Sequence, residues 1–185
     1  RPRIIYATPV WAPQSIELIS KLESIQRRAT KFILRLSFST SIDYRTRLQS
    51  LKLLPITYWH EVLDMIFFYK ATHNLVSLNG SVLPVKRVEE PRATLTHVIK
   101  FVPKKCKTTT YQNSFFIRAC RIWNTLASII NIEAQTLNSC KTVLFNYYLA
   151  SLLISYDLNN PKTFKSICLK CNTVRPLNSK ITSCI

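Results

Sequence analysis

The chain has 185 residues, with 26 lysines and arginines against 9 aspartates and glutamates, and its formal net charge is +17. Hydrophobic residues make up 47% of it, enough to bury the core of one domain or of two small subdomains. Gly80 is the one glycine, which excludes glycine-rich phosphate loops and dinucleotide-binding fingerprints and makes tight hairpins scarce. We therefore expect a mainly α chain with a polyanionic partner, nucleic acid being a better candidate than an anionic membrane surface.

The first strong pattern in chain order is a basic amphipathic helix, predicted from Ser20 to Leu36. Its apolar residues recur at the spacing of a helix that buries one stripe, and they are Leu22, Ile25, Ala29, Phe32, Ile33 and Leu36, with Leu18 one turn earlier. Gln26 falls at the edge between this stripe and a cationic side. We expect the cationic side to contact an anion, and its residues are Arg27, Arg28, Lys31 and Arg35. The alternative is a solvated face whose helix pairs stabilise it by only a few tenths of a kcal/mol.

The next two helices are predicted on either side of Pro55. A short one begins near Tyr44 and ends before that proline. Residues 56–76 form the most aromatic stretch and are apolar on most sides, which predicts a helix at the centre of the core. His60 and His73 lie near its two ends without a partner at metal-ligand spacing, so we interpret both as structural or surface residues.

Beyond Gly80 the helical pattern is lost for about thirty residues. A short strand is predicted at Val98–Val102 within this otherwise irregular connector. No acid occurs from Pro91 to Ile132, while cations and aromatic rings occur there together, so rings could stack on bases as cations meet phosphates. The alternative is a solvated basic segment. The cations that we assign to nucleic-acid contact here are Lys104, Lys105, Lys107, Arg118 and Arg121.

Two further helices are predicted at residues 114–130 and 137–155, and a basic tail follows them. The expected architecture is a small helical bundle, mainly α, with a long irregular connector. The predicted divisions are residues 1–13, a helical region at 14–78, the basic connector at 79–112, the C-terminal helices at 113–156 and a basic cysteine-containing tail at 157–185.

Catalysis is not expected of this chain by itself. Its nine acids are scattered, and only Glu61 and Asp64 lie at helical spacing, in a helix that we expect in the core. Two-metal phosphoryl transfer needs closely placed carboxylates, and three isolated histidines give no nucleophile–base arrangement.

One pattern resembles a metal site. Cys168 and Cys171 form a CxxC pair, with Cys184 further along, and three thiolates would need a fourth ligand to close a structural zinc site. The alternative is ordinary free cysteines. The uneven cysteine distribution predicts a reducing, intracellular compartment.

The order of several motifs resembles one known family, the reverse transcriptases of non-LTR (LINE-type) retrotransposons, especially the jockey-like group. Residues 1–11, RPRIIYATPVW, are similar to the RPxxxYASPVW stretch beyond the polymerase palm, and residues 22–31, LESIQRRATK, to the LExxQRRAxR helix of the thumb. Departures from the family pattern occur at Trp59, His60, Ala127 and Cys140. Weaker similarities follow in the family's order at Tyr44, Arg47, Leu48, Leu51, Leu53 and Leu54, then Tyr58, Asp64, Tyr69 and Lys70, then Phe115, Phe116, Arg118, Trp123, Asn124 and Leu126, then residues 137–144.

The resemblance implies that residues 1–13 end the palm-to-thumb connection and that residues 14–78 are thumb-like. The parent protein would be an RNA-directed DNA polymerase whose palm, with its Mg²⁺, lies before this chain, so this chain itself would carry no cofactor apart from zinc at the tail. Its partners would be RNA, RNA–DNA or DNA duplex and the remainder of the parent polymerase, in the nucleus and cytoplasm.

Two alternatives to this function stay open. One is a non-catalytic basic helical module for interaction or for a membrane surface, and the other is a decayed retroelement remnant. Under the reverse-transcriptase interpretation no membrane partner is expected, and the longest apolar run, Val143–Ile154, is shorter than the roughly 20 residues that span a bilayer.

Overall fold

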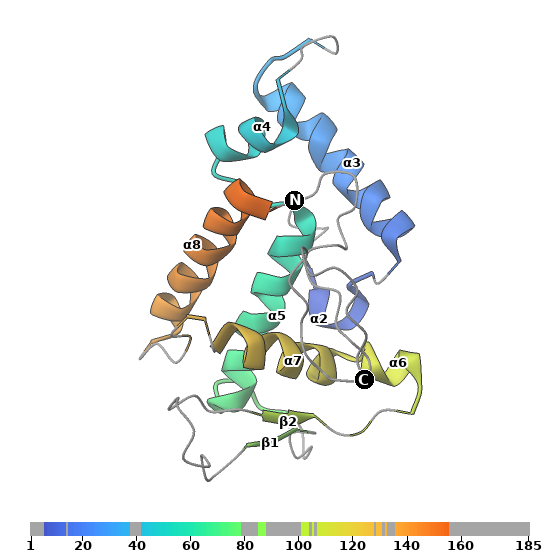
Figure 1. Ribbon diagram of the computed structural model, residues 1–185, viewed down its shortest axis with the longest axis vertical. Coiled ribbons are helices and arrows are strands. Elements are labelled where there is room, and N and C mark those ends of the chain that lie inside the picture. Colours follow the sequence, from blue (N-terminus) through green and yellow to red (C-terminus); the bar gives the residue numbers. More distant parts are fainter. Residues whose placement is uncertain are drawn as a thin grey trace, which may run out of the picture.

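The computed structural model describes residues 6–13, 15–37, 42–78, 85–87, 101–103, 105, 107–127, 129–130, 132 and 136–155. Over these residues the chain is a small, mainly helical bundle, as its sequence predicts (Figure 1). The helices are α2 (Thr8–Trp11), α3 (Ile16–Ile33), α4 (Tyr44–Ser50), α5 (Ile56–Thr72), α6 (Thr109–Gln112), α7 (Phe115–Ala127) and α8 (Leu137–Ser155), and the strands are β1 (Val85–Arg87) and β2 (Phe101–Pro103).

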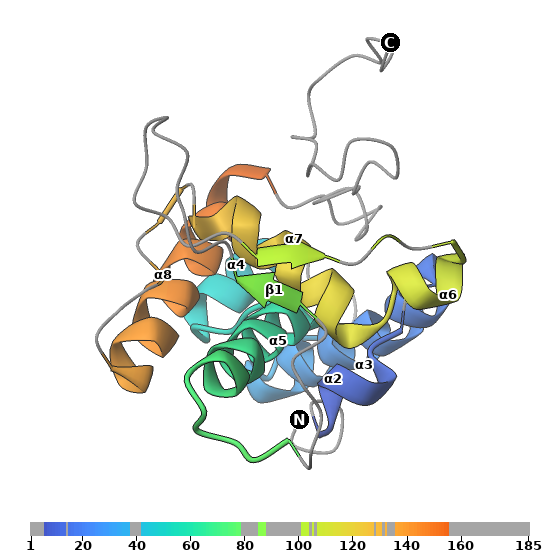
Figure 2. The same ribbon diagram turned by 90° about the horizontal axis from the view of Figure 1, so that it is seen from below.

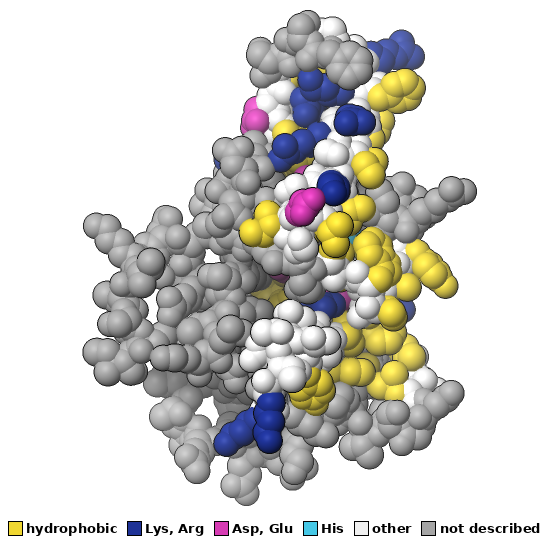
Figure 3. Space-filling model, turned by 90° about the vertical axis from the view of Figure 1, so that its right-hand side faces the viewer, with side chains coloured by type: hydrophobic (Ala, Val, Ile, Leu, Met, Phe, Trp, Pro, Cys, Tyr) yellow, Lys and Arg dark blue, Asp and Glu magenta, His cyan; other side chains and the backbone are white. Residues whose placement is uncertain are grey.

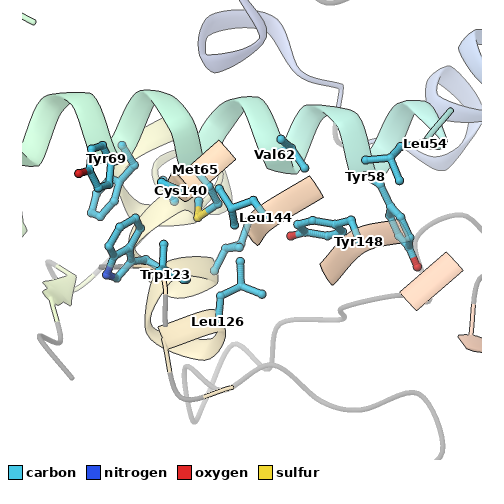
Figure 4. Packing of buried hydrophobic residues seen from close by; sticks show 14 of the residues in the cluster. Leu54, Tyr58, Val62, Met65, Tyr69, Trp123, Leu126, Cys140, Leu144 and Tyr148 are labelled. Carbon is cyan, nitrogen blue, oxygen red and sulfur yellow. The ribbon is translucent and has the colours of Figure 1, made fainter. Parts of the chain in front are cut away.

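Helix α5 is the centre of the bundle, which confirms the prediction made from its aromatic sequence. It contacts α7 and α8 as well as α2 and α3 (Figure 1). Figure 4 shows Met65 and Val62 of α5 directed toward α7 and α8, where Leu144 and Leu126 face them. A helix that is covered by neighbours on several sides needs apolar residues on several sides, and this one has them.

A single hydrophobic core joins the two regions that the sequence suggested as separate divisions. Residues of α4 and α5, within 14–78, belong to the same buried cluster as residues of α7 and α8, within 113–156. Trp123 of α7, 1% exposed, packs against Phe68 of α5 with ring centroids 5.4 Å apart. The two regions therefore stabilise one another and share one folded unit.

The connector contains a two-stranded antiparallel sheet that lies against α7 (Figure 2). Val85 pairs with Pro103 and Arg87 with Phe101. The strand expected at Val98–Val102 is found at Phe101–Pro103, whereas residues 98–100 lie outside the described residues. Asn124 fastens this strand to α7, because its amide accepts from the Phe101 N–H at 2.9 Å and donates to the Phe101 carbonyl at 2.7 Å.

Three helices end in left-handed residues that are not glycine. Helix α3 stops at Ile33, earlier than the predicted Leu36, because Arg35 takes φ 52° and the Leu36 N–H bonds back to the Lys31 carbonyl at 3.0 Å. Lys52 and Asn74 do the same after α4 and α5, with φ of 49° and 54°. Arg35 and Lys52 each cost about 1 kcal/mol in this conformation, and their charge near a helix C-terminus offsets part of that cost, whereas asparagine adopts it more readily.

No helix in the described part of the chain combines the length and apolarity needed to cross a bilayer.

His60, within α5, and His73, directly after it, both pack against aromatic rings. His60 is buried with its ring 5.5 Å from that of Trp11, and His73 stacks on Tyr69 at 3.9 Å.

Candidate nucleic-acid interface

Helix α3 carries the predicted basic face. Its apolar side faces solvent and its polar side is buried, which is the reverse of the prediction. The side that packs on α4 and α5 is mostly polar, and its buried residues are Ile19, Glu23, Gln26 and Thr30. The apolar stripe expected to pack on the core faces outward instead, with Phe32 86% exposed and Ile25 52% exposed. The predicted burial of that stripe is therefore wrong, because hydrogen-bond partners on α4 and α5 allow polar side chains to occupy the inward side.

The inward side of α3 is a hydrogen-bonded network. Glu23 accepts from the Tyr44 hydroxyl through one carboxylate oxygen and from the Ile56 N–H, at 2.9 Å, through the other. The Gln26 amide donates to the Leu54 carbonyl at 2.9 Å and to the Tyr44 hydroxyl oxygen at 3.1 Å. Gln26 is 7% exposed, so its predicted position at the edge of the basic face, available to nucleic acid, is also wrong.

Arg27 has a structural contact as well as a charge. Its guanidinium lies 5.2 Å from the centroid of the Tyr44 ring, on the helix that follows, and its side chain is half-buried. Arg27 therefore helps to hold α4 against α3. The remaining cations of the predicted stripe reach the surface to different degrees: Arg28 and Arg35 are exposed and Lys31 is half-buried.

These cations give one side of α3 a positive potential that the described acids do little to offset. Of the acids on this helix, Glu23 faces inward, and Glu17 forms an exposed ion pair with Lys21 at 3.0 Å, near the beginning of the helix. Figure 3 shows dark blue cations gathered over the far end of the helix, beside a line of yellow apolar side chains. A magenta acidic side chain lies beside these cations in Figure 3, and Asp43, at the beginning of α4, is exposed, so cations outnumber carboxylates at this end but do not stand alone.

The second predicted group of cations is divided by the structure. Lys105 and Lys107 are exposed, and Lys104 lies outside the described residues. Arg118 forms an ion pair with Asp64 of α5 at 2.8 Å, and Arg121 is 6% exposed. The burial of Arg121 contradicts its assignment to nucleic-acid contact. Arg118 is half-buried and already paired with a carboxylate, so its assignment stays a prediction.

Glu61 and Asp64, the acids at helical spacing, each contact a different helix. Tyr148 of α8 donates to Glu61 at 2.5 Å, while Asp64 takes two hydrogen bonds from Arg118 of α7, at 3.0 and 2.8 Å. Burial, only partly countered by Arg118, raises the pKa of Asp64 to about 6. These acids thus tie α5 to its two neighbours.

Compared with protein-family models, curated proteins and solved structures, the chain gives no match. Glu23 and Gln26, from the first helix motif, meet Tyr44 from the next, and Asp64 meets Arg118. Several residues of the sequence motifs therefore join helices to one another. The sequence analysis did not predict this role, although Glu23, Gln26 and Thr30 recur at helical spacing.

The cysteines of the predicted zinc site, Cys168, Cys171 and Cys184, lie outside the described residues, so zinc at the tail stays a prediction. Over the part of the chain that the structure does describe, no group of three or more histidine, cysteine, aspartate or glutamate side chains is placed to hold a metal ion.

We expect Cys120 and Cys140 to resist alkylation while the chain is folded. Both are buried, and burial raises the pKa of the Cys120 thiol to about 12 and that of the Cys140 thiol to about 11, which removes almost all of the reactive thiolate at pH 8. Peptide-level mass spectrometry after brief iodoacetamide treatment should find both unmodified until urea is added. Fast labelling of either thiol in the native chain would contradict this placement.

Proposed function

We propose that this chain is the thumb and C-terminal region of a non-LTR retrotransposon reverse transcriptase, and that it grips template–primer duplex through the phosphate backbone. The order of the sequence motifs supports the family, and the exposed end of α3 supports the grip. Polymerisation would belong to the remainder of the parent polymerase, with its palm and Mg²⁺, and this chain would contribute binding. The same reading implies RNA, RNA–DNA or DNA duplex as partners and the nucleus and cytoplasm as location.

The observation that carries the proposal is the cationic end of α3. Arg28 and Lys31 lie on α3 about one helical turn apart, and Arg35 follows two residues after its last residue, Ile33. One strand of a duplex presents a phosphate about every 3.4 Å along the axis, so cations spaced about 5 Å apart can each meet a different phosphate. Because the inward side of the helix is held by the Glu23 and Gln26 hydrogen bonds, the cations have a fixed direction. Backbone contacts of this kind position a duplex without reading its sequence.

We expect binding to an RNA–DNA primer–template to fall steeply with salt in the wild type and much less steeply in the variant Arg28→Gln/Lys31→Gln/Arg35→Gly. Each lost phosphate contact lowers the slope of log K against log salt by about 0.9, so the slope should fall by roughly 2.7. Affinity should drop about 10-fold or more near 100 mM salt. Fluorescence anisotropy with a labelled duplex from 50 to 300 mM salt measures both quantities. Glycine suits the left-handed position of Arg35, so this change removes charge without destabilising the helix end.

The matched control removes the same charge elsewhere. Lys52→Gly/Lys70→Gln/Lys141→Gln neutralises three cations, and its glycine again replaces a residue with positive φ. We expect this variant to keep most of the wild-type affinity and slope. If the two variants bind alike, the attraction is diffuse and the grip by α3 is refuted. If the wild type shows no salt-dependent binding, the chain fits a decayed remnant better.

A further inference from the structure

The outward side of α3 has the residue pattern of a helix-pairing surface. Leu18 and Ile25 are about half exposed, at 51% and 52%, and Phe32 is 86% exposed. We define the α3 seam as Leu18, Leu22, Ile25, Ala29 and Phe32, which alternate at intervals of four and three residues. That alternation is the one by which two helices interdigitate side chains. Isolated apolar residues are common on surfaces, whereas a continuous line of them marks an interaction site (Figure 3).

The seam cannot be covered by rolling α3 toward the core. Such a rotation would separate Glu23 from the Ile56 N–H and Gln26 from the Leu54 carbonyl. The two side chains and the two backbone groups would then lose their hydrogen-bond partners, and each buried polar group without a partner lowers the stability of the fold. The buried polar side therefore holds the apolar side in solvent.

The charge at the border of the seam selects its partner. Lys21 and Arg28 lie seven residues apart along one edge of α3, and Arg35 follows just beyond the end of the helix; all three are exposed. In paired helices the residues at this edge lie opposite the partner's flanking positions, where opposite charge favours and like charge opposes association. The edge is cationic, apart from Glu17 beside Lys21 at its beginning. A complementary helix therefore carries acidic residues along its border.

We propose that the α3 seam docks an amphipathic helix of another protein, with a leucine-like apolar stripe and an acidic border. From Leu18 to Phe32 the seam extends over about 21 Å, so a helix of about 14 residues covers it. The apolar residues of the seam take no part in the proposed duplex grip. The two surfaces have only the cationic border in common. Docking through the seam therefore does not depend on whether the chain binds duplex.

Two other occupants fit the seam less well. A second copy of the chain offers no acidic border, and in an antiparallel pair it would bring the same cationic edge against itself, where like charges oppose pairing. An anionic bilayer favours a broad apolar face with cations on both sides, whereas this seam is about one helix stripe wide and is cationic along one edge. Both remain outcomes of the experiment.

The experiment uses the full chain and three labelled synthetic peptides of about 21 residues. The first is an amphipathic helix with leucine at the pairing positions and glutamate along the border, the second has lysine in place of glutamate, and the third is a scramble of the first. Fluorescence anisotropy at about 150 mM salt should show the first peptide binding at least 10-fold more tightly than either of the others. Equal binding of the first and third peptides would overturn the proposal, since only charge would then be recognised.

Two protein variants localise the binding. Ile25→Ser/Phe32→Ser should weaken the acidic peptide at least 10-fold, whereas Leu75→Ser/Ile129→Ser, which alters apolar residues 58% and 57% exposed outside α3, should leave it unchanged. All four side chains are exposed, so circular dichroism should show the same unfolding midpoint. The first variant should also keep the wild-type salt slope on duplex, which separates this proposal from the grip.

Three further results would overturn the proposal. The first is no binding of the acidic peptide. The second is a dimer, seen by sedimentation of the chain alone, that Ile25→Ser/Phe32→Ser abolishes, because the occupant would then be a second copy. The third is binding to phosphatidylserine vesicles that the same variant abolishes, without peptide binding, because the occupant would then be a membrane surface.

Discussion

Replacing Glu23 by alanine is expected to destabilise the folded chain by about 3 kcal/mol or more. The carboxylate is 1% exposed and accepts hydrogen bonds from the Tyr44 hydroxyl and the Ile56 N–H. Without it, both donors lose this acceptor while they remain buried, whereas the Gln26 amide keeps the Leu54 carbonyl and the Tyr44 oxygen. Removing one member of a buried charged network costs more than deleting an exposed contact, because the desolvated partners lose their compensation.

The position of Glu23 relative to α5 adds to this effect. Ile56 is the first residue of α5, and its preceding Pro55 offers no side-chain cap. The Glu23 carboxylate therefore caps α5 from another helix, where the first N–H groups lack partners and the helix dipole favours negative charge. Loss of Glu23 should loosen α3 and the beginning of α5 together.

Urea unfolding followed by circular dichroism measures the expected change. Glu17→Ala is the matched control, because this residue lies on the same helix in an exposed ion pair and should shift the free energy of unfolding by less than about 1 kcal/mol. Glu23→Gln, which keeps one acceptor oxygen, should lie between the two. If Glu23→Ala is as stable as Glu17→Ala, the inward packing of this side of α3 is wrong.

The contrast between α5 and α3 explains how far the sequence predicts the fold. Helix α5 is apolar on most sides, so any reading of its sequence buries it. Helix α3 carries an apolar stripe and a polar stripe of the same period, and periodicity alone does not say which is inward. The polar stripe is buried because Tyr44 and Ile56, 21 and 33 residues beyond Glu23, supply its hydrogen-bond partners. Such pairing at a distance is not visible in a local pattern.

The sequence also predicted part of the candidate site, namely the exposed cations of α3, but not the pairing of the cations on α7. Arg28 and Arg35 reach the surface as the basic stripe predicts, because nothing in the described fold covers that side of α3. Arg118 belongs to an acid-free run, which suggests an available cation, yet its counter-charge Asp64 lies 54 residues earlier in the chain. Charge runs read along the sequence therefore overestimate the cations available to a ligand when acids of another helix pack against them.

Replacing Arg118 by methionine is expected to destabilise the chain by about 3–5 kcal/mol at pH 8 and by much less at pH 5. The Arg118–Asp64 pair joins α7 to α5 at 2.8 Å, and the Asp64 side chain is 3% exposed. At pH 8 the variant must either bury an unpaired carboxylate or bind a proton. At pH 5, below the pKa of about 6 that burial gives Asp64, the wild-type carboxyl is already mostly protonated, so the guanidinium contributes less.

The direction in which wild-type stability changes with pH follows from the same pKa of Asp64. Because the pKa of Asp64 rises from 3.8 in the unfolded chain to about 6 in the folded one, the folded state binds more protons between these values. The contribution of this group to stability is therefore fully present below about pH 4 and falls as the pH rises through 6, by at most about 3 kcal/mol at 1.36 kcal/mol per pKa unit. Asp64→Asn removes this titration, so the stability of Asp64→Asn relative to wild type should rise from pH 4 to pH 7 and then level off.

Urea unfolding of the wild type, Arg118→Met and Asp64→Asn at pH 4, 5, 6 and 8 tests both statements together. Lys21→Met, which breaks the exposed pair with Glu17, is the matched control and should change stability by less than about 1 kcal/mol at every pH. A destabilisation by Arg118→Met that is equally large at pH 5 and pH 8 would mean that Asp64 stays ionised at pH 5. The arginine would then neutralise the carboxylate throughout this range, and the balance between burial and pairing at this contact would be the reverse of the one described.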